Sequence, residues 1–425
     1  MKKYRISVIL TILTLAVVYI LTNIFKLVGN IVMPIFQERF DMTSRLTGFI
    51  TGSYYIAYAP LQFLAAPLSH KFGAERVIGS SLILGALGAF LWSIAPNSTT
   101  VLIGRLLLGL GVGPAYIGTL YYISKYAIDN DYTIFSGILL AAGGLGSVVS
   151  SLPLSILIER RGANEVFLVI GAIMIALSLL LFVLFFLNKK GDNSINIQDK
   201  TSTNVWQNLK DSVKYVFKYP PLLLGVFMWG MFNSYQLCYQ GLWSAKWARV
   251  AYPEFTSIAG LTGSICSLGF VISSCISEPL RRKNRLTTVK RSEYYLAICG
   301  FLTIAVHLIV YISGVSTTLL YIIKCISDFF LGYTMGHFCI QMTAFTKDIT
   351  RSDMNANVMG LMNGGGSLLC LLFQYLTGQI YDISHKTLNP NLSYALAFTV
   401  VATILLAFAL SASIAQEKYK DKELS

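Results

Sequence analysis

Twelve stretches of roughly 20 mostly apolar residues follow one another along this chain, each long enough to cross a ~30 Å hydrocarbon core as a helix. Apolar residues make up 55% of the sequence and charged residues only 12%. Backbone amides that face lipid must form their hydrogen bonds within their own segment, so every span is predicted to be helical. The spans are 6–36, 45–68, 76–94, 100–124, 132–157, 165–188, 221–245, 256–279, 291–313, 317–340, 354–381 and 392–414. The sequence therefore predicts an all-α integral membrane protein with twelve transmembrane helices in a lipid bilayer.

One long hydrophilic segment, residues 191–220, separates these spans into two sets of six. The pattern R-x3-G-x3-G that begins at Arg105 recurs as D-x3-G-x3-G beginning at Asp328, 223 residues later. Matching helices at matching places are typical of transporters whose two halves move against each other around a central site. We therefore expect two pseudo-symmetric six-helix bundles, residues 1–190 and 221–425, joined by a cytoplasmic linker.

The positive charges are unevenly divided between the two sets of loops. The chain has 33 Lys and Arg against 20 Asp and Glu, a formal net charge of +13. If the N-terminus is cytoplasmic, most Lys and Arg fall in cytoplasmic segments, with the largest groups in 189–220 and 281–291. Both termini are therefore predicted to be cytoplasmic. We assign the charge to membrane orientation and anionic headgroups, and we expect no nucleic-acid partner.

Several other classes of protein are disfavoured by the sequence. Its longest hydrophilic stretch, about 30 residues, is too short to fold as a separate catalytic domain, so an ATP-driven pump or an enzyme is not expected. All seven cysteines lie in spans of the second half without metal-ligand spacing. The glycine runs 143–146 and 364–366 lack the Lys-Ser/Thr of a nucleotide cradle. We predict no metal, no cofactor and no catalytic residue.

Two segments resemble known motifs. Residues 66–76, APLSHKFGAER, resemble the G-x-L-x-D-R-x-G-x-x-R loop of the major facilitator superfamily, and the segment from Arg105 is similar to its R-x-x-x-G-x-G element. The resemblance extends over nearly the whole chain. Ala66, His70 and Lys71 replace the usual glycine, aspartate and arginine. The missing aspartate is the one that helps to hold the outward-facing state in that superfamily.

A narrower resemblance is to a bacterial branch of this superfamily that includes nutrient importers of intracellular pathogens. It is carried by residues 54–62 (YYIAYAPLQ), 143–146 (GGLG) and 240–243 (QGLW). The resemblance implies a major facilitator fold, alternating access of a central site to the two sides, and a place in the bacterial cytoplasmic membrane. We expect the protein to act as a monomer.

Ionisable groups within apolar spans are site candidates, because each costs at least ~2.5–3.5 kcal/mol to insert. Lys26 lies on one helical face with Asn23 and Asn30. In anion-transporting relatives a cation occupies this helix, so the resemblance places Lys26 in the substrate cavity, and Asn30 on the same face is a second candidate ligand. The alternative is that Lys26 extends to an outer headgroup. Arg105 shares a face with two glycines, and a structural role and a substrate or proton role are both open.

The tenth span carries Lys324 and, one turn later, Asp328. In one interpretation Asp328 is a proton-coupling group and Lys324 also meets the substrate. In the other, the two form a constant ion pair that makes the helix tolerable in lipid.

Polar and aromatic side chains recur at helical spacing in the second and seventh spans. They line an aqueous cavity in one interpretation and join neighbouring helices in the other. These residues are Tyr55, Tyr58 and Gln62 in the second span, and Gln236, Tyr239, Gln240 and Trp243 in the seventh. We select Tyr55, Tyr58, Gln236 and Gln240 as candidate substrate ligands.

Three cations against one carboxylate within the spans favour a substrate that carries a negative group. The predicted function is secondary active transport of a small organic solute, either a carboxylate-bearing anion or an amino-acid-like zwitterion, with proton-coupled uptake. Alternatives are an efflux antiporter or a nucleoside or sugar importer of the same fold. From another class, a non-transporting membrane receptor remains an alternative.

Overall fold

The computed structural model describes residues 5–127, 131–190, 205–276, 285–310, 316–350 and 355–420, and within these ranges every regular element is a helix. The first part of the chain forms α1 (Ile6–Leu27), α2 (Gly29–Arg39), α3 (Ser44–Phe72), α4 (Ala74–Ser93), α5 (Ser98–Val112), α6 (Ala115–Tyr126), α7 (Asp131–Val149), α8 (Leu152–Arg161) and α9 (Ala163–Lys190). The second part forms α10 (Val205–Lys218), α11 (Pro220–Cys238), the π-helical turn η1 (Tyr239–Trp243), α12 (Ser244–Ala251), the 3₁₀ turn η2 (Pro253–Ile258), α13 (Leu261–Ile276), α14 (Arg285–Ile309), α15 (Thr317–Ile349), α16 (Asn355–Ser384) and α17 (Pro390–Lys420).

Within the described residues, each predicted span coincides with one helix or with consecutive helices separated by a short break. The first span is α1 and α2, broken at Val28, and the seventh is α11, η1 and α12. Seven helical segments in the described ranges are long and apolar enough to cross a membrane, or eight if α7 and α8, bent by 50° to each other, form one span. Others are too short for that test, such as α13 with 16 residues. The all-helical membrane fold is confirmed, whereas helix length alone does not yield all twelve spans.

Local sequence explains where several helices begin and end. Thr43 and Asn97 cap α3 and α5 by accepting hydrogen bonds from the amides of Leu46 and Thr100. Gly73 follows α3 with φ at +87°, a conformation that favours glycine, so the chain turns directly into α4.

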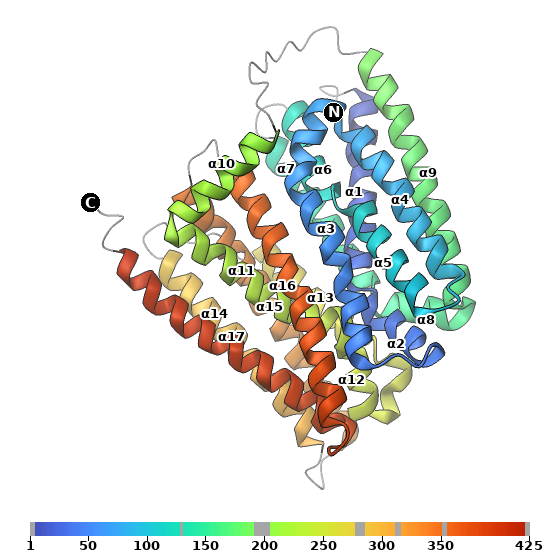
Figure 1. Ribbon diagram of the computed structural model, residues 1–425, viewed down its shortest axis with the longest axis vertical. Helices are drawn as coiled ribbons and strands as arrows, with labels where there is room; N and C mark the ends of the chain where they lie inside the picture. Colours follow the sequence, from blue (N-terminus) through green and yellow to red (C-terminus); the bar gives the residue numbers. More distant parts are fainter. Residues whose placement is uncertain are drawn as a thin grey trace.

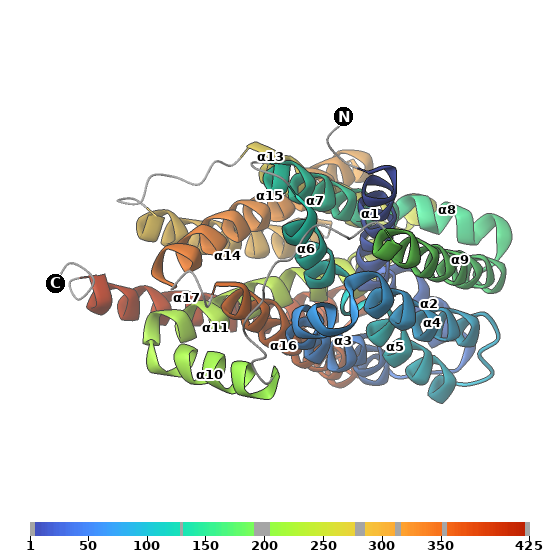
Figure 2. The same ribbon diagram turned by 90° about the horizontal axis from the view of Figure 1, so that it is seen from above.

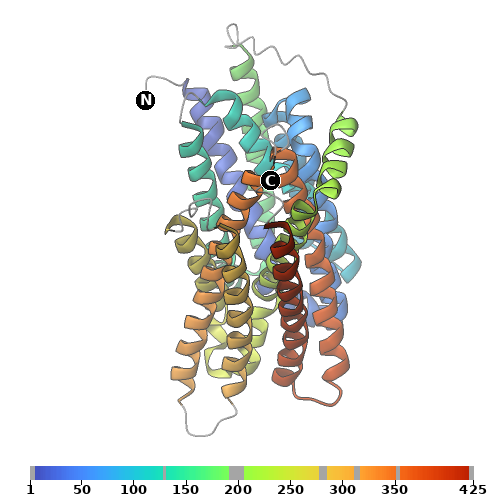
Figure 3. The same ribbon diagram turned by 90° about the vertical axis from the view of Figure 1, so that its left-hand side faces the viewer.

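The helices form two bundles, α1–α9 and α11–α17, which lie side by side (Figures 1 and 2). Seen from the side, the long helices of both bundles follow the same general direction (Figure 3). The predicted linker is described only in part: 191–204 lie outside the described residues, and 205–218 form α10, which packs on α11 and α16. The bundles meet mainly along α3 and α16, and along α7 and α13.

Glycines bring α3 and α16 into backbone contact. A Cβ on Gly52 would lie 2.7 Å from the Cα of Leu371, and one on Gly364 would lie 2.9 Å from the carbonyl oxygen of Ala59. Since neither backbone can yield, both positions require glycine at this helix spacing. The two bundles therefore touch at their closest along this seam.

Hydrogen bonds between the bundles gather toward one end of the molecule, which we call the distal end; it carries α2, α12 and the last turn of α16 (lower part of Figure 1). There the carboxylate of Asp382 accepts hydrogen bonds from the amides of Ser44 (2.9 Å) and Arg45 (2.7 Å), the first residues of α3. Lys246 of α12 donates to Gln37 of α2. Among the described residues, the bond nearest the opposite end is Asn363 to Gln62, at 2.9 Å. These hydrogen bonds hold the two bundles together and close the molecule at the distal end.

We expect Asp382→Ala to loosen this closed end, because two helix N-terminal amides lose their carboxylate acceptor. Spin labels on Leu46 and Ile383, both exposed near the contact, should show a population at longer separation than in the parent, by electron-spin distance measurements. Glu38→Ala is the matched control, an exposed carboxylate at the same end. Identical distance distributions in the Asp382 variant and the parent would refute the role of this cap.

Candidate substrate and coupling site

Lys26 lies in the last turn of α1, two residues before the break at Val28, and belongs to the first bundle. Its ammonium is 4.9 Å from the ring centre of Tyr58 on α3. No carboxylate pairs with it among the residues that the structure describes. The hydroxyls of Tyr54 and Tyr58 are buried and make no hydrogen bond there. Lys26 is thus a half-buried cation beside Tyr58 with no carboxylate partner in the described structure.

Arg105 of α5 is fully buried and ties three spans together. Its Nη1 donates to the carbonyl of Phe25 (2.7 Å) and its Nε to the carbonyl of Thr51 (3.1 Å). The guanidinium carbon also lies 4.6 Å from the ring centre of Tyr54. Both bonds go to backbone carbonyls of α1 and α3, which supports the structural interpretation.

We predict that Arg105→Gln and Arg105→Lys both lower the melting temperature, because neither side chain can donate to both carbonyls in the fork geometry of a guanidinium. Each lost charge-assisted bond costs about 1.5–3 kcal/mol. Thermal unfolding in detergent checks this, with substrate affinity measured on the folded fraction. A parent-like melting temperature with abolished binding would instead assign Arg105 to the substrate.

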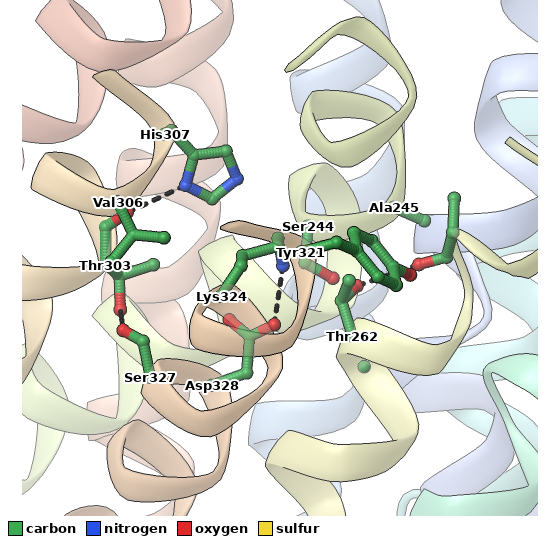
Figure 4. Close-up of polar contacts among 12 residues, drawn as sticks. Ser244, Ala245, Thr262, Thr303, Val306, His307, Tyr321, Lys324, Ser327 and Asp328 are labelled. Atoms are coloured by element: carbon green, nitrogen blue, oxygen red, sulfur yellow. Dashed lines mark hydrogen bonds and ion pairs between the residues drawn. The ribbon is translucent and has the colours of Figure 1, made fainter. Parts of the chain in front are cut away.

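The second bundle holds a buried polar triad, of which Figure 4 labels Lys324 and Asp328. Lys324 and Asp328 of α15 form an ion pair at 2.5 Å, with both side chains fully buried. The hydroxyl of Tyr239 donates to the other carboxylate oxygen (2.6 Å) and lies 3.3 Å from the Lys324 ammonium. Tyr239 reaches this position from the π-helical turn η1, the kind of irregular turn that often marks functional positions. Helical spacing singled out Tyr239 in the sequence but did not reveal its contact with Asp328.

His307 of α14 is a buried neighbour of this triad, within electrostatic reach of Lys324. Its Nδ1 donates to the carbonyl of Thr303 (2.7 Å) and its ring stacks on Trp247, with ring centres 3.9 Å apart. The Nε2 atom has no hydrogen-bond partner in the described structure. His307 is a lone histidine in the ninth predicted span, and no sequence pattern indicates that it lies near Asp328.

Three of the predicted substrate ligands form hydrogen bonds between or within helices. Asn30 donates to the Ser244 hydroxyl (2.9 Å) and accepts from the Ala245 amide (2.8 Å), joining the first and seventh spans. Gln236 donates to Gln240 (3.2 Å), which in turn donates to the carbonyl of Gly263 on α13 (3.0 Å). These arrangements match the alternative in which the polar stripe joins helices.

Tyr55, a predicted substrate ligand, and Gln62, a further member of the same polar stripe, both lie on α3. Tyr55 is buried beside Tyr54, with ring centres 5.1 Å apart. Gln62 donates to the carbonyl of Gly113 and accepts from Asn363 of the other bundle. Among the described residues, no hydrogen bond or ion pair joins Lys26 or Arg105 to the Lys324 and Asp328 pair. The predicted cations therefore lie in two separate groups, one in each bundle.

Comparison with known proteins agrees with this architecture. An uncharacterized transporter of Buchnera aphidicola subsp. Schizaphis graminum is 24% identical over 273 residues, 64% of this chain and 63% of that protein. The probable sulfoacetate transporter SauU of Cupriavidus necator is 22% identical over 172 residues, 40% of each chain. The alignments thus span less than two thirds of the length of these relatives.

Solved transporters share the fold at low sequence identity. The structure of the nucleoside transporter NupG matches with a TM-score of 0.72 at 17% identity, covering 98% of this chain and 100% of that one. The D-xylose-proton symporter matches with a TM-score of 0.70 at 14% identity, covering 94% and 97%. The family profile of the Major Facilitator Superfamily matches residues 11–374. The chain is therefore a multi-pass membrane protein that belongs to the Major Facilitator Superfamily, a family of transporters and not of enzymes, as the sequence predicted.

Proposed function

We propose that the protein moves a small organic solute with a carboxylate or similar anionic group, including an amino-acid-like zwitterion, by proton-coupled uptake. The observation that carries this proposal is Lys26, a half-buried cation within the first bundle that has no carboxylate partner among the described residues. A charged group inside a membrane protein is energetically costly unless an opposite charge pairs with it. The anionic group of the substrate would be the partner of the Lys26 ammonium. Tyr54 and Tyr58 have buried hydroxyls to donate to the same anion.

The proposed coupling group is Asp328. Its carboxylate is held by Lys324 and Tyr239, so taking up a proton would remove the charge that keeps the Lys324 ammonium in place. The released ammonium is then available to a second anionic or polar group of the solute. Protonation and solute occupancy are linked in this scheme, which is the requirement for gradient-driven transport.

Access would alternate by separation of the two bundles at the distal end. The seam of α3 and α16 supplies a line of close backbone contact, and the cap formed by Asp382 supplies a contact that can be broken and remade. Such rigid-body motion around a fixed site is the usual way in which paired bundles expose it to each side.

A thermal-shift screen of the purified protein tests the substrate class. Carboxylates and amino acids should raise the melting temperature, since a ligand at 100 times its Kd stabilises by about 2.7 kcal/mol. Stabilisation by nucleosides or neutral sugars alone would replace the anion proposal with the alternative suggested by the solved structures of similar fold. The receptor alternative predicts binding without uptake in proteoliposomes.

We further propose that both termini are cytoplasmic in a bacterial inner membrane and that the distal end faces outward. A cysteine at Thr387, exposed in the loop after α16, should react with impermeant reagents from outside the cell, and one at Ser124, exposed near the end of α6, only from inside. The background should carry Cys275→Ser, because Cys275 is exposed. The reversed labelling pattern would refute the orientation.

A further inference from the structure

A cavity of about 250 Å³ lies within the first bundle, at the end opposite the distal contacts, among the ends of α3, α4, α6 and α9. It is separate from the proposed transport site. Lys71, Arg76, Lys125 and Lys189 line it, with Glu75 as the one carboxylate among the described lining residues. The lining thus has an excess of three positive charges, before His70 is counted.

Two buried polar atoms of the lining have no partner in the described structure. The Ser69 hydroxyl, on a residue that is 1% exposed, makes no hydrogen bond, and neither does the Oδ1 atom of Asn188. The N-terminus of α4 lies at the same cavity, where Gly73 offers no side-chain cap for the first amides. The Ser69 hydroxyl and the N-terminal backbone amides of α4 are donors that can bind phosphate oxygens beside these cations, whereas the Oδ1 atom of Asn188 is an acceptor and does not contribute.

The carboxylate of Glu75 offsets part of this charge, because it accepts a hydrogen bond from its own amide at the start of α4 and lies near Lys125 and Arg76. It accepts a hydrogen bond from the Nδ2 atom of Asn188 (3.1 Å), and that nitrogen also contacts Tyr122 (3.0 Å) and Thr11 (3.1 Å). Glu75 is thus held at the floor of the cavity by a buried network. The cations at the rim remain in excess.

We infer that this cavity binds the phosphate group of an anionic phospholipid at the membrane surface. Exposed apolar side chains beside it favour a lipid as the source of the phosphate: Phe72, at the end of α3, is 44% exposed, and Phe186 on α9 is 60% exposed. Acyl chains can pack on these rings while the headgroup enters the cavity. The ligand class is a phosphate ester, held by charge and by the Ser69 hydroxyl.

The test is binding of phosphatidylglycerol, phosphatidylcholine and inorganic phosphate to the full chain in detergent, by native mass spectrometry and thermal shift. Phosphatidylglycerol should bind and phosphatidylcholine should not. The double variant Lys71→Gln/Arg76→Gln should bind phosphatidylglycerol roughly 25-fold more weakly, at about fivefold per basic residue. Ser69→Ala should weaken it further without unfolding the protein.

Arg160→Gln/Arg161→Gln is the matched control, with the same loss of charge on exposed arginines at the end of α8. It should bind phosphatidylglycerol like the parent. An equal loss in both double variants would overturn the site in favour of overall charge, and equal binding of the two lipids would overturn anion recognition. Stabilisation by inorganic phosphate that Lys71→Gln/Arg76→Gln removes would keep the phosphate site but assign it to a soluble ligand.

Discussion

Asp328→Asn abolishes solute accumulation driven by an imposed pH gradient, while exchange of solute across the membrane continues. This expected result follows from the buried triad, in which Asp328 accepts from Lys324 and Tyr239 and is the one group there that can gain a proton from the ion-paired state. Exchange requires no net proton movement, so it tolerates a side chain that cannot titrate. Uptake and counterflow in proteoliposomes measure the two activities separately.

A single substitution leaves the Lys324 ammonium buried without its partner, which can prevent folding. The double variant Lys324→Gln/Asp328→Asn removes both charges and keeps two hydrogen-bonding side chains, so it should fold and show the same loss of driven uptake. Tyr239→Phe keeps the ring but removes one donor to Asp328. It should shift the pH at which driven uptake is half-maximal without abolishing it. If the double variant accumulates solute like the parent, Lys324 and Asp328 form only a structural ion pair and do not couple transport to protons.

Lys26→Gln should weaken solute binding roughly 10- to 100-fold, because a hydrogen bond to a charged group contributes about 1.5–3 kcal/mol. Lys26→Arg keeps the charge and should retain most of the affinity. Lys214→Gln, an exposed lysine on α10, is the matched control and should leave binding unchanged. Titration calorimetry with the ligand found by the thermal-shift screen gives the three dissociation constants.

An unchanged affinity in Lys26→Gln, with the melting temperature preserved, would contradict the proposed anchor. The anionic group would then have to be sought at Lys324, and the Lys324→Gln/Asp328→Asn variant would show it by a loss of affinity in addition to the loss of coupling. The two sets of variants therefore separate substrate recognition from proton coupling.

The sequence by itself determined the membrane class and the fold, because a helix that crosses lipid is specified by length and apolar content within one contiguous segment. It also brought out the motifs of the superfamily and the pairing of Lys324 with Asp328, since residues four apart share a helix face. These features are local, and the family profile confirms the superfamily.

Only the tertiary structure decided which polar groups meet across helices. Asn30 has the same helical spacing as a cavity ligand, yet its amide is engaged by Ser244 and Ala245, more than 200 residues away. Arg105 reaches the carbonyl of Phe25, three residues before the break at Val28, and Tyr239 reaches Asp328 from the π-helical turn. Helical periodicity shows which face a side chain occupies within its own helix, but the neighbour that it meets depends on how the helices pack.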